Sequence, residues 1–511
     1  MKLKKLFASL LSIGLLLSPI HICAEDSIGT VYAYSEDPDT TSQVYYSIDD
    51  AWHEACAGIK ICLTSDWNLS DRLIVPEGAN VTIEMNGYKI DRGLSSTEND
   101  GEVIYLSKNS TLTLTGNSFS DTEFSFNGYK YSSSSETISL TSGGLVTGGY
   151  SANGAGGIHM KKGTTLNLEH VAIAGNKGIG EFTNDGGGIN MNNDDCTVNL
   201  TNSLIMYNCA RAGGGIYVAG ENSYINMISS EISYNYAKSI GGGICSYNDA
   251  TYVTMNQNSR INDNYAVDNG GGVYFYYPYC QVVSSDSLAA IENNESSKDG
   301  GGIYFATSSR GDTMKVSNIT FNKNKAKGNG GAIYVAMNGF SILDSRFYEN
   351  KANNGGAVYA FRAKNLKVSN CTMTMGKASS NGGGMYINGY NATFSGTMNI
   401  KGNTSDSSSK NNVYLNEDVC ISGNLEKDSS VGITTSGTRK VVVDVSEDNG
   451  TYFLDESDCK ITYSDGALYK ESNSALGSIF GNSNVLIAAV GVVGICVVGI
   501  VLARKKNREE A

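Results

Sequence analysis

The sequence predicts an all-β fold, a right-handed parallel β-helix solenoid with three strands per coil, and three recurring features predict it. A motif that usually reads Gly-Gly-small-aliphatic-Tyr occurs ten times from Ile158 to Val413, at intervals of 25 to 31 residues. An alternating apolar pair follows most copies, and then an aliphatic residue or Phe placed three residues before Asn. A fixed period of this length indicates stacked supersecondary units. Helical spacing is absent from the region, so each unit is a coil of short strands.

The glycine-rich motif marks the first strand of each coil. Equivalent aliphatic residues should point inward and stack in one column, because every strand pairs with its counterpart one coil later. The glycine pair suits a tight corner that excludes a Cβ. The aliphatic positions are Ile158, Ile189, Ile216, Ile244, Val273, Ile303, Ile333, Val358, Met385 and Val413.

The second and third strands carry the other two features. Pairs such as Val198/Leu200 and Ile225/Met227 alternate with polar residues, as expected of strands with one buried face. The asparagines that follow the third strand can form a hydrogen-bonded ladder, and we interpret them as turn residues rather than as a phosphate or metal site. They are Asn176, Asn208, Asn235, Asn264, Asn294, Asn324, Asn350 and Asn403.

The residue between the two inward positions of the first strand must point outward. Seven copies place tyrosine there, which predicts a row of rings spaced about 4.8 Å apart. The rings either only stabilise the sheet by stacking, or also form a platform for sugar rings or protein partners. The candidate binding residues are Tyr217, Tyr274, Tyr304, Tyr334, Tyr359, Tyr386 and Tyr414, and the other copies carry His159, Asn190 and Cys245.

The two ends of the chain predict its location. Residues 1–24 have the basic start and apolar stretch of a secretory signal peptide, cleaved after Ala24 or, alternatively, after Ala33. Residues 485–503 are uncharged and long enough to cross a bilayer, and the basic tail 504–511 should stay in the cytoplasm. Because no proline follows Pro278, an LPxTG-like site is absent. We therefore expect a single-pass cell-membrane protein with an extracellular ectodomain.

Between these ends we expect three further parts. Residues 25–58 form an N-terminal segment, in which residues 47–57 read as a short helix that covers the first coil. The solenoid spans residues 59–468, with an external loop at Ser132–Ser135. Residues 469–484 read as a flexible stalk.

Charge and cysteine content exclude several partners. The net charge is −13 and no basic stripe is interleaved with aromatics, so nucleic acid is not expected. The cysteines lack CxxC spacing, so we expect no zinc or other metal, and no cofactor. Most should be small buried hydrophobes, although Cys56 and Cys62 could pair.

Two motifs in register carry a family resemblance. Phe321–Asn324 with Gly330–Ile333, and Phe347–Asn350 with Gly355–Val358, resemble the FxxN and GGAI repeats of chlamydial polymorphic outer-membrane proteins. The resemblance implies a surface β-helix and an adhesin role, and we expect this chain to lack the β-barrel of those proteins. Residues 81–87 also resemble the first rungs of pectate-lyase-like folds.

The function expected from these features is an adhesin or extracellular interaction surface for a glycan or protein of a host or neighbouring cell. The alternatives are a surface polysaccharide lyase or glycoside hydrolase, and a passive spacer. Catalysis would need paired carboxylates on one face. Asp185, Asp194 and Asp195 are the densest acidic group, which we interpret as solvated, and neither His53 nor His159 has an evident nucleophile partner. We therefore predict no catalytic residue.

Overall fold

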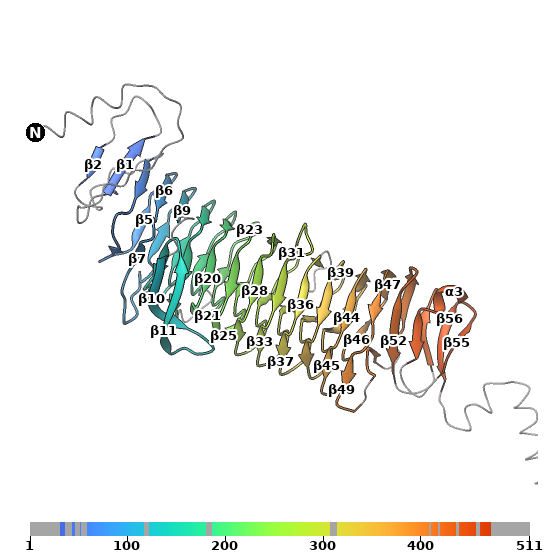
Figure 1. Ribbon diagram of the computed structural model, residues 1–511. Coiled ribbons are helices and arrows are strands. Elements are labelled where there is room, and N and C mark those ends of the chain that lie inside the picture. The colour runs from blue at the N-terminus through green and yellow to red at the C-terminus, as the bar shows by residue number, and fades with distance from the viewer. Residues whose placement is uncertain are drawn as a thin grey trace, which may run out of the picture.

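The protein forms one elongated parallel β-solenoid, drawn in Figure 1. The computed structural model describes residues 31–35, 43–45, 52, 59–116, 122–179, 186–306, 314–407, 410–416, 419–435, 439–455 and 460–471. The predicted signal peptide, transmembrane segment and tail lie outside these residues. Among the residues described, no helix is long and apolar enough to span a bilayer. The all-β solenoid is thus confirmed, whereas its right-handedness stays a prediction.

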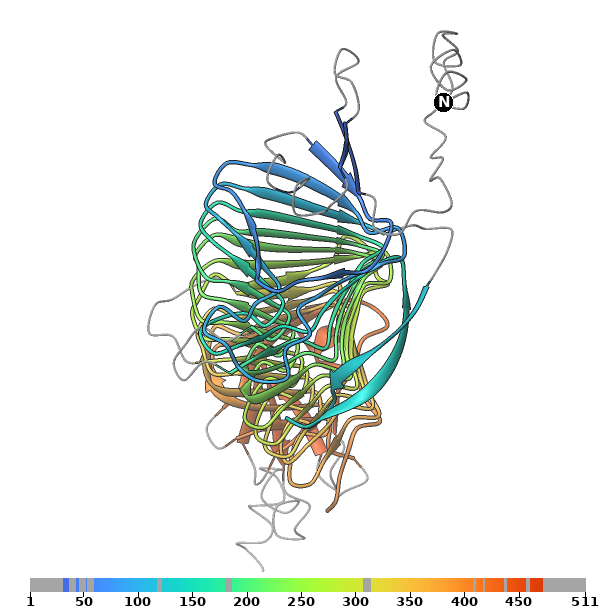
Figure 2. The same cartoon turned by 90° about the vertical axis from the view of Figure 1, so that its left-hand side faces the viewer.

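Each coil contributes strands to stacked parallel rows, which we call ladders 1 to 4. Ladders 1, 2 and 3 contain the three strands that were predicted for each coil. Ladder 4 was not predicted. Its strands follow the asparagine and have only two residues in most coils. Viewed in Figure 2, the strands of successive coils lie over one another.

Ladder 1 contains the ten motif strands predicted from the sequence and, before them, β5 and β8. They are β5 (Leu73–Val75), β8 (Ile104–Leu106), β14 (Ile158–Met160), β18 (Ile189–Met191), β22 (Ile216–Val218), β26 (Ile244–Ser246), β30 (Val273–Phe275), β34 (Ile303–Phe305), β38 (Ile333–Val335), β42 (Val358–Lys364), β46 (Met385–Tyr390) and β50 (Val413–Leu415).

Ladder 2 contains the alternating strands. They are β3 (Ile59–Cys62), β6 (Asn80–Glu84), β9 (Thr111–Thr115), β15 (Thr165–Glu169), β19 (Thr197–Thr201), β23 (Ser223–Ile228), β27 (Thr251–Asn256), β31 (Gln281–Val283), β35 (Lys315–Ser317), β39 (Ser341–Leu343), β43 (Lys367–Ser369), β47 (Ala392–Gly396), β51 (Ile421–Leu425) and β53 (Arg439–Val443).

Ladder 3 precedes the asparagine turn, and its strand β52 also pairs with the end of ladder 1. Its strands are β4 (Trp67–Asn68), β7 (Lys89–Asp91), β12 (Leu145–Thr147), β16 (Ala172–Ala174), β20 (Leu204–Met206), β24 (Glu231–Ser233), β28 (Arg260–Asn262), β32 (Ala290–Glu292), β36 (Thr320–Asn322), β40 (Arg346–Tyr348), β44 (Thr372–Thr374), β48 (Asn399–Ile400), β52 (Ser430–Thr434) and β54 (Phe453–Asp455).

Ladder 4 runs only through the middle coils. Its strands are β13 (Tyr150–Ser151), β17 (Lys177–Gly178), β21 (Cys209–Ala212), β25 (Tyr236–Ile240), β29 (Tyr265–Ala266), β33 (Glu295–Ser296), β37 (Lys325–Ala326), β41 (Lys351–Ala352), β45 (Lys377–Ala378) and β49 (Thr404–Ser405).

One hydrophobic core fills the inside of the solenoid along its length. Ile216 pairs in register with Ile244, and Ile303 with Ile333, and all four side chains have no exposed surface. The predicted inward column is therefore confirmed. Aromatic residues stack inside as well, with a ring-centroid distance of 4.8 Å between Phe321 and Phe347.

The asparagine ladder forms as predicted from Asn176 to Asn350, Gly376 interrupts it before Asn403, and all eight asparagine side chains are fully buried. The Nδ2 group of Asn208 donates to Oδ1 of Asn235 at 3.1 Å and to the carbonyl oxygen of Ile173 at 2.9 Å. The backbone N–H of Asn208 donates to the same Oδ1 at 3.1 Å. Because a buried amide without partners is costly, these bonds between coils make the turn compatible with the core.

The glycine pair has the corner role expected from the sequence. Gly270, Gly300 and Gly330 have φ values of 69°, 64° and 68°, which favour glycine. A Cβ on the following residue, Gly271, would lie 2.5 Å from the carbonyl oxygen of Glu295 in the next coil. The second glycine is therefore required by close backbone approach.

Both ends of the solenoid pair with antiparallel strands. At the N-terminal end, β1 (Val31–Ser35) pairs with β3 and with β2 (Gln43–Tyr45). Trp52 packs edge-on against Trp67 at 5.9 Å, and the rest of the predicted helix 47–57 lies outside the described residues. At the other end, α3 (Glu447–Gly450) precedes the antiparallel strands β55 (Lys460–Ser464) and β56 (Ala467–Glu471).

A hairpin stands outside the coils where the sequence predicted only a loop. It consists of β10 (Thr122–Tyr129) and β11 (Ser135–Ser142), and we call it the hairpin arm. Phe124 and Phe126 pack against the outer side of ladder 3, at Ala172, Ala174 and Met206. This apolar contact fixes the arm along the solenoid (Figure 1).

Candidate functional site

The seven predicted tyrosines lie at equivalent positions of ladder 1, and we call them the tyrosine ladder. Six of them stack continuously from Tyr274 to Tyr414, with centroid distances from 4.7 to 5.4 Å between neighbouring rings. Tyr217 is separated from this stack by Cys245, which occupies the intervening coil. The structure therefore brings the predicted residues together in one row.

Exposure differs along the tyrosine ladder. Tyr217, Tyr274 and Tyr334 are only 2%, 6% and 8% exposed, whereas Tyr304, Tyr359, Tyr386 and Tyr414 are half-buried. The first part of the row is covered by an outer apolar cluster that includes Ala212, Ile240, Tyr247 and Tyr276. Tyr304 stands between the buried Tyr274 and Tyr334, so Tyr359, Tyr386 and Tyr414 form the uninterrupted run of half-buried rings that a ligand could contact.

Burial also changes the acidity of the phenols. Desolvation raises the pKa of Tyr359 to about 12, and it raises the pKa values of Tyr274 and Tyr334 as well. The nearby carboxylate of Asp299 contributes to the increase at Tyr334 and Tyr359. These phenols are therefore neutral at physiological pH, and they present hydroxyl groups rather than charges to a ligand.

A second polar row precedes the glycine pair and lies close to the tyrosine ladder. The backbone N–H of Asn329 donates to Asp299 at 2.6 Å, and Nδ2 of Asn354 donates to Oδ1 of Asn329 at 2.9 Å. The N–H of Asn381 donates to Oδ1 of Asn354 at 3.2 Å. Side-chain amides thus accompany the half-exposed rings, which gives this face both aromatic and hydrogen-bonding groups.

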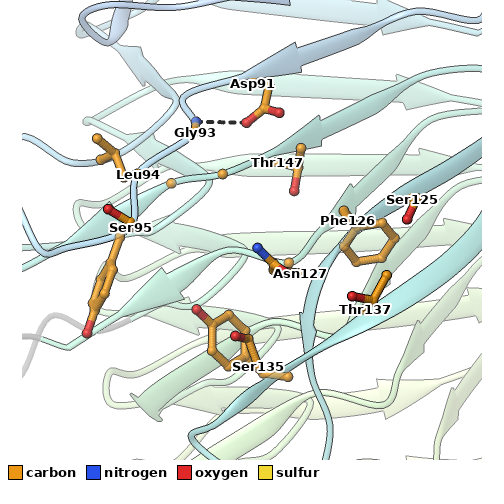
Figure 3. A pocket seen from close by; sticks show the side chains of 15 residues that line it. Asp91, Gly93, Leu94, Ser95, Ser125, Phe126, Asn127, Ser135, Thr137 and Thr147 are labelled. Carbon is orange, nitrogen blue, oxygen red and sulfur yellow. Dashed lines mark hydrogen bonds between the residues drawn. The ribbon is translucent and has the colours of Figure 1, made fainter.

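A pocket with a volume of about 490 Å³ lies between the hairpin arm and the solenoid (Figure 3). One wall is the loop after β7, including Asp91 and Ser95, and the floor includes Thr147 and Gly175. The opposite wall is the hairpin arm, from which Asn127 and Thr137 line the pocket. Four chain segments that are distant in sequence therefore build it.

The charged groups around this pocket already have partners. Oδ1 of Asp91 accepts the Gly93 N–H at 2.8 Å, and its Oδ2 pairs with Nζ of Lys89 at 2.8 Å. Nζ of Lys177 lies 5.1 and 4.5 Å from the ring centroids of Tyr129 and Tyr150. Desolvation raises the pKa of Tyr129 to about 12, so its phenol is also neutral. The remaining lining is rich in hydroxyl groups.

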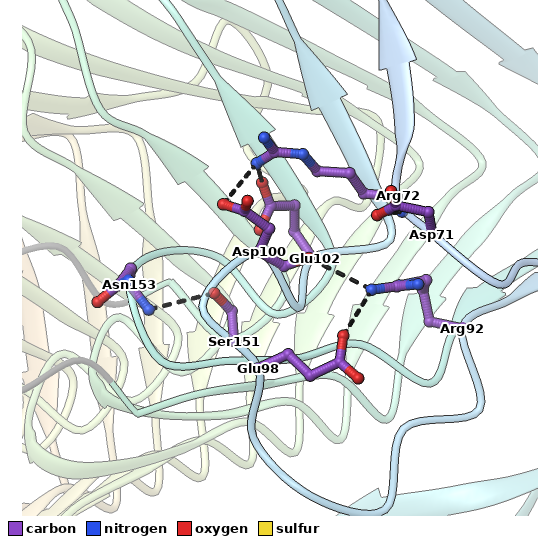
Figure 4. Close-up of polar contacts among 8 residues, drawn as sticks. All are labelled: Asp71, Arg72, Arg92, Glu98, Asp100, Glu102, Ser151 and Asn153. Carbon is purple, nitrogen blue, oxygen red and sulfur yellow. Dashed lines mark hydrogen bonds and ion pairs between the residues drawn. The ribbon is translucent and has the colours of Figure 1, made fainter.

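A cluster of ion pairs occupies the neighbouring coils (Figure 4). Nη1 of Arg72 contacts Asp100 at 3.0 Å and Glu102 at 2.5 Å, and Nη2 of Arg92 contacts Glu98 at 2.9 Å. Burial raises the pKa of Glu102, and the Arg72 guanidinium opposes that increase. Because Asp100 and Glu102 share one guanidinium, they are not arranged as an acid and a base on opposite sides of a substrate.

His159 belongs to the same region, at an outward position as predicted. Its ring stacks on Tyr105 at 5.2 Å and is only 7% exposed. Desolvation, with the positive charges of Lys161 and Arg72, lowers its pKa to about 3. His159 is thus a neutral, packed side chain.

The other acidic candidates fit their interpretation as solvated charges. Asp194 and Asp195 are about half-exposed and lie 3.6 and 3.8 Å from Nζ of Lys162, while Asp185 lies outside the described residues. Within the described ranges, no group of three or more His, Cys, Asp or Glu residues is placed to hold a metal ion. The described cysteines at 196, 209, 245, 280 and 371 are buried and not in disulfides.

The pocket was missed by the sequence analysis, although a signal for one of its walls was present. Phe124 and Phe126 alternate with polar residues, as do Ile138 and Leu140, on either side of the serine-rich turn. Two alternating segments around a short polar turn indicate a hairpin. The pairing of the arm with the solenoid had no such signal, because it depends on contacts distant in sequence.

Comparison with known proteins gives one match. Residues 318–336 match the repeat of the Chlamydia polymorphic membrane proteins. No curated protein and no solved structure is significantly similar to the chain. The matched segment contains β36, β37 and β38, with the buried Asn324 and the Gly330 corner. The chain therefore carries, on a parallel β-solenoid, a repeat of the type found in chlamydial polymorphic membrane proteins.

Proposed function

We propose that the chain is a membrane-anchored cell-surface adhesin, and that it binds an extracellular glycan or protein through Tyr359, Tyr386 and Tyr414. The observation that carries the proposal is the continuous stack of half-buried rings at these positions, with centroid distances of 5.0 and 5.1 Å. Flat rings held in one row offer apolar contact area and hydroxyl groups at little cost in side-chain entropy.

Two further observations support a surface location. The repeat matched at residues 318–336 is one described for membrane proteins. The sequence of residues 1–24 has the features of a signal peptide, and residues 485–503 have the length and apolarity of a membrane anchor. An ectodomain displayed in this way would extend its ladders away from the membrane.

The geometry favours binding over polysaccharide cleavage. In the described part of the chain, Asp100 and Glu102 lie close together, and Arg72 pairs with both. A glycosidase needs one carboxylic acid to protonate the leaving group while the other acts as base or nucleophile. Asp100 and Glu102 both face the one guanidinium of Arg72, so they are not placed on the two sides of a bound sugar.

The test is binding of the full-length chain to an array of glycans and extracellular-matrix proteins. The variant Tyr359→Ser/Tyr386→Ser/Tyr414→Ser should lose binding to the ligand that the array identifies. The control is Tyr224→Ser/Tyr252→Ser, which removes another stacked pair, 5.1 Å apart, from ladder 2. Equal binding by the two variants would refute the proposal, provided that both retain the melting behaviour of a folded solenoid.

A further inference from the structure

The pocket beneath the hairpin arm is separate from the tyrosine ladder and has its own chemistry. None of the seven ladder tyrosines lines it. Its volume of about 490 Å³ lies within the usual range of ligand sites, about 300 to 1,000 Å³. Tyr129 and Tyr150 supply aromatic rings, and Asn127 supplies an amide (Figure 3).

The floor is shaped by glycines that permit close packing of the arm. Gly148 and Gly175 have φ values of 77° and 70°. A Cβ on Gly175 would lie 2.5 Å from the carbonyl oxygen of Asn127 and 2.6 Å from the Phe126 ring. The arm is therefore seated directly on the turn, and Phe126 is held there by the apolar cluster with Ala172 and Ala174. Such a wall is preorganised, which lowers the entropic cost of binding.

The balance of charge in the pocket identifies the kind of ligand. Asp91 is the single charged residue among those that line it, and its carboxylate is already engaged by Lys89 and by the Gly93 N–H. The other polar lining groups are neutral: hydroxyls of Ser95, Ser125, Ser135, Thr137 and Thr147, the Asn127 amide and two phenols. A charged ligand would lose its hydration without finding a free counter-charge.

We propose that this pocket binds a neutral saccharide. Hydroxyl and amide groups can exchange hydrogen bonds with sugar hydroxyls, since each can donate and accept. The rings of Tyr129 and Tyr150 offer apolar faces for the C–H side of a sugar. Nζ of Lys177 lies over both rings and donates to the carbonyl oxygen of Ser133 at 3.4 Å. The site is independent of the ligand proposed for the tyrosine ladder.

Calorimetry measures binding to the full-length chain of five disaccharides. Four are neutral, namely mannobiose, cellobiose, galactobiose and diacetylchitobiose, and digalacturonate is the acidic probe. At least one neutral disaccharide should bind. Asn127→Leu and Thr137→Val, which are exposed positions of the arm, should each weaken that binding about tenfold by removing a hydrogen bond. The matched control Ser139→Ala, also exposed on β11, should bind like the parent.

Three results would overturn the proposal. The first is that no neutral disaccharide binds, the second is that digalacturonate alone binds, and the third is that both pocket variants bind like Ser139→Ala. The triple variant of the tyrosine ladder separates this proposal from the adhesin proposal, because it should bind the disaccharide normally. Near-ultraviolet circular dichroism of each variant verifies that the hairpin arm is still packed.

Discussion

The middle and C-terminal coils differ from the N-terminal coils in how they are built. From β22 to β46, successive coils repeat the same inward aliphatics and glycine corner, and all but one, in which Gly376 replaces the asparagine, repeat the asparagine turn. The coils before β14 contain the hairpin arm, the pocket and the Arg72 and Arg92 ion pairs. Regular repetition yields a long surface of identical groups, whereas the departure from the repeat at the hairpin arm yields a partly open pocket. The two regions therefore suit different kinds of ligand.

The largest expected effect is at the regular core. Ile303→Asp places an unpaired carboxylate in a column where Ile303 has no exposed surface, and it should lower the free energy of unfolding by on the order of 4 kcal/mol. Thr320→Asp, at an only partly buried outward position of β36, is the control and should cost far less. Chemical denaturation measures both. If the two variants unfold alike, the inward register of the regular coils is misassigned.

The next effect is an acid-sensitive contact in β14, where the irregular coils meet the repeated ones. The pKa of His159 is lowered from 6.5 to about 3, so the folded state keeps the ring neutral while the unfolded chain protonates it. This contribution to the free energy of unfolding is fully present above pH 6.5 and is lost as the pH falls toward 3. At pH 4 the free energy of unfolding should be lower by about 3 kcal/mol than at neutral pH. His159→Phe should melt with a weaker acid dependence than the parent, and an unchanged dependence would contradict the assignment.

The smallest effect distinguishes exposed from covered tyrosines. Tyr386→Ala removes two stacking contacts at a half-buried position and should cost about 1 kcal/mol. Tyr274→Ala, at a position only 6% exposed, should cost about 3 kcal/mol because it also leaves a cavity. Thermal melts compare the stability that the two variants lose. If both lose the same amount, the tyrosine ladder is uniformly covered, and the surface on which the adhesin proposal depends is absent.

Much of the regular region could be predicted because its signals are local and repeated. Period-two alternation placed Ile216 inward and Tyr217 outward, and the asparagine spacing predicted the buried ladder. The burial of Tyr217 and Tyr274 could not be predicted in this way, because their cover comes from Ile240, Tyr247 and Tyr276, which lie beyond the repeat motif. An outward direction from the core does not by itself determine exposure.

The pocket of the irregular region could not be predicted for a different reason. Residues 91–95 and 147–150 follow the paired ladder 3 strands β7 and β12, but no repeat indicates where the hairpin arm, the other wall of the pocket, packs against them. Ladder 4 was missed because two-residue strands such as Lys325–Ala326 are too short to show alternation. The signal peptide, the helix 47–57 and the membrane anchor stay predictions, since apart from Trp52 they lie outside the described residues.

The most direct test of the central claim measures attachment through the half-exposed end of the tyrosine ladder. Surface plasmon resonance of the full-length chain would use the array ligand, with Tyr359→Ser/Tyr386→Ser/Tyr414→Ser beside Tyr224→Ser/Tyr252→Ser. The account predicts that the first variant loses binding while it remains folded, and that the second binds like the parent. Parent-like binding by the first variant would contradict it.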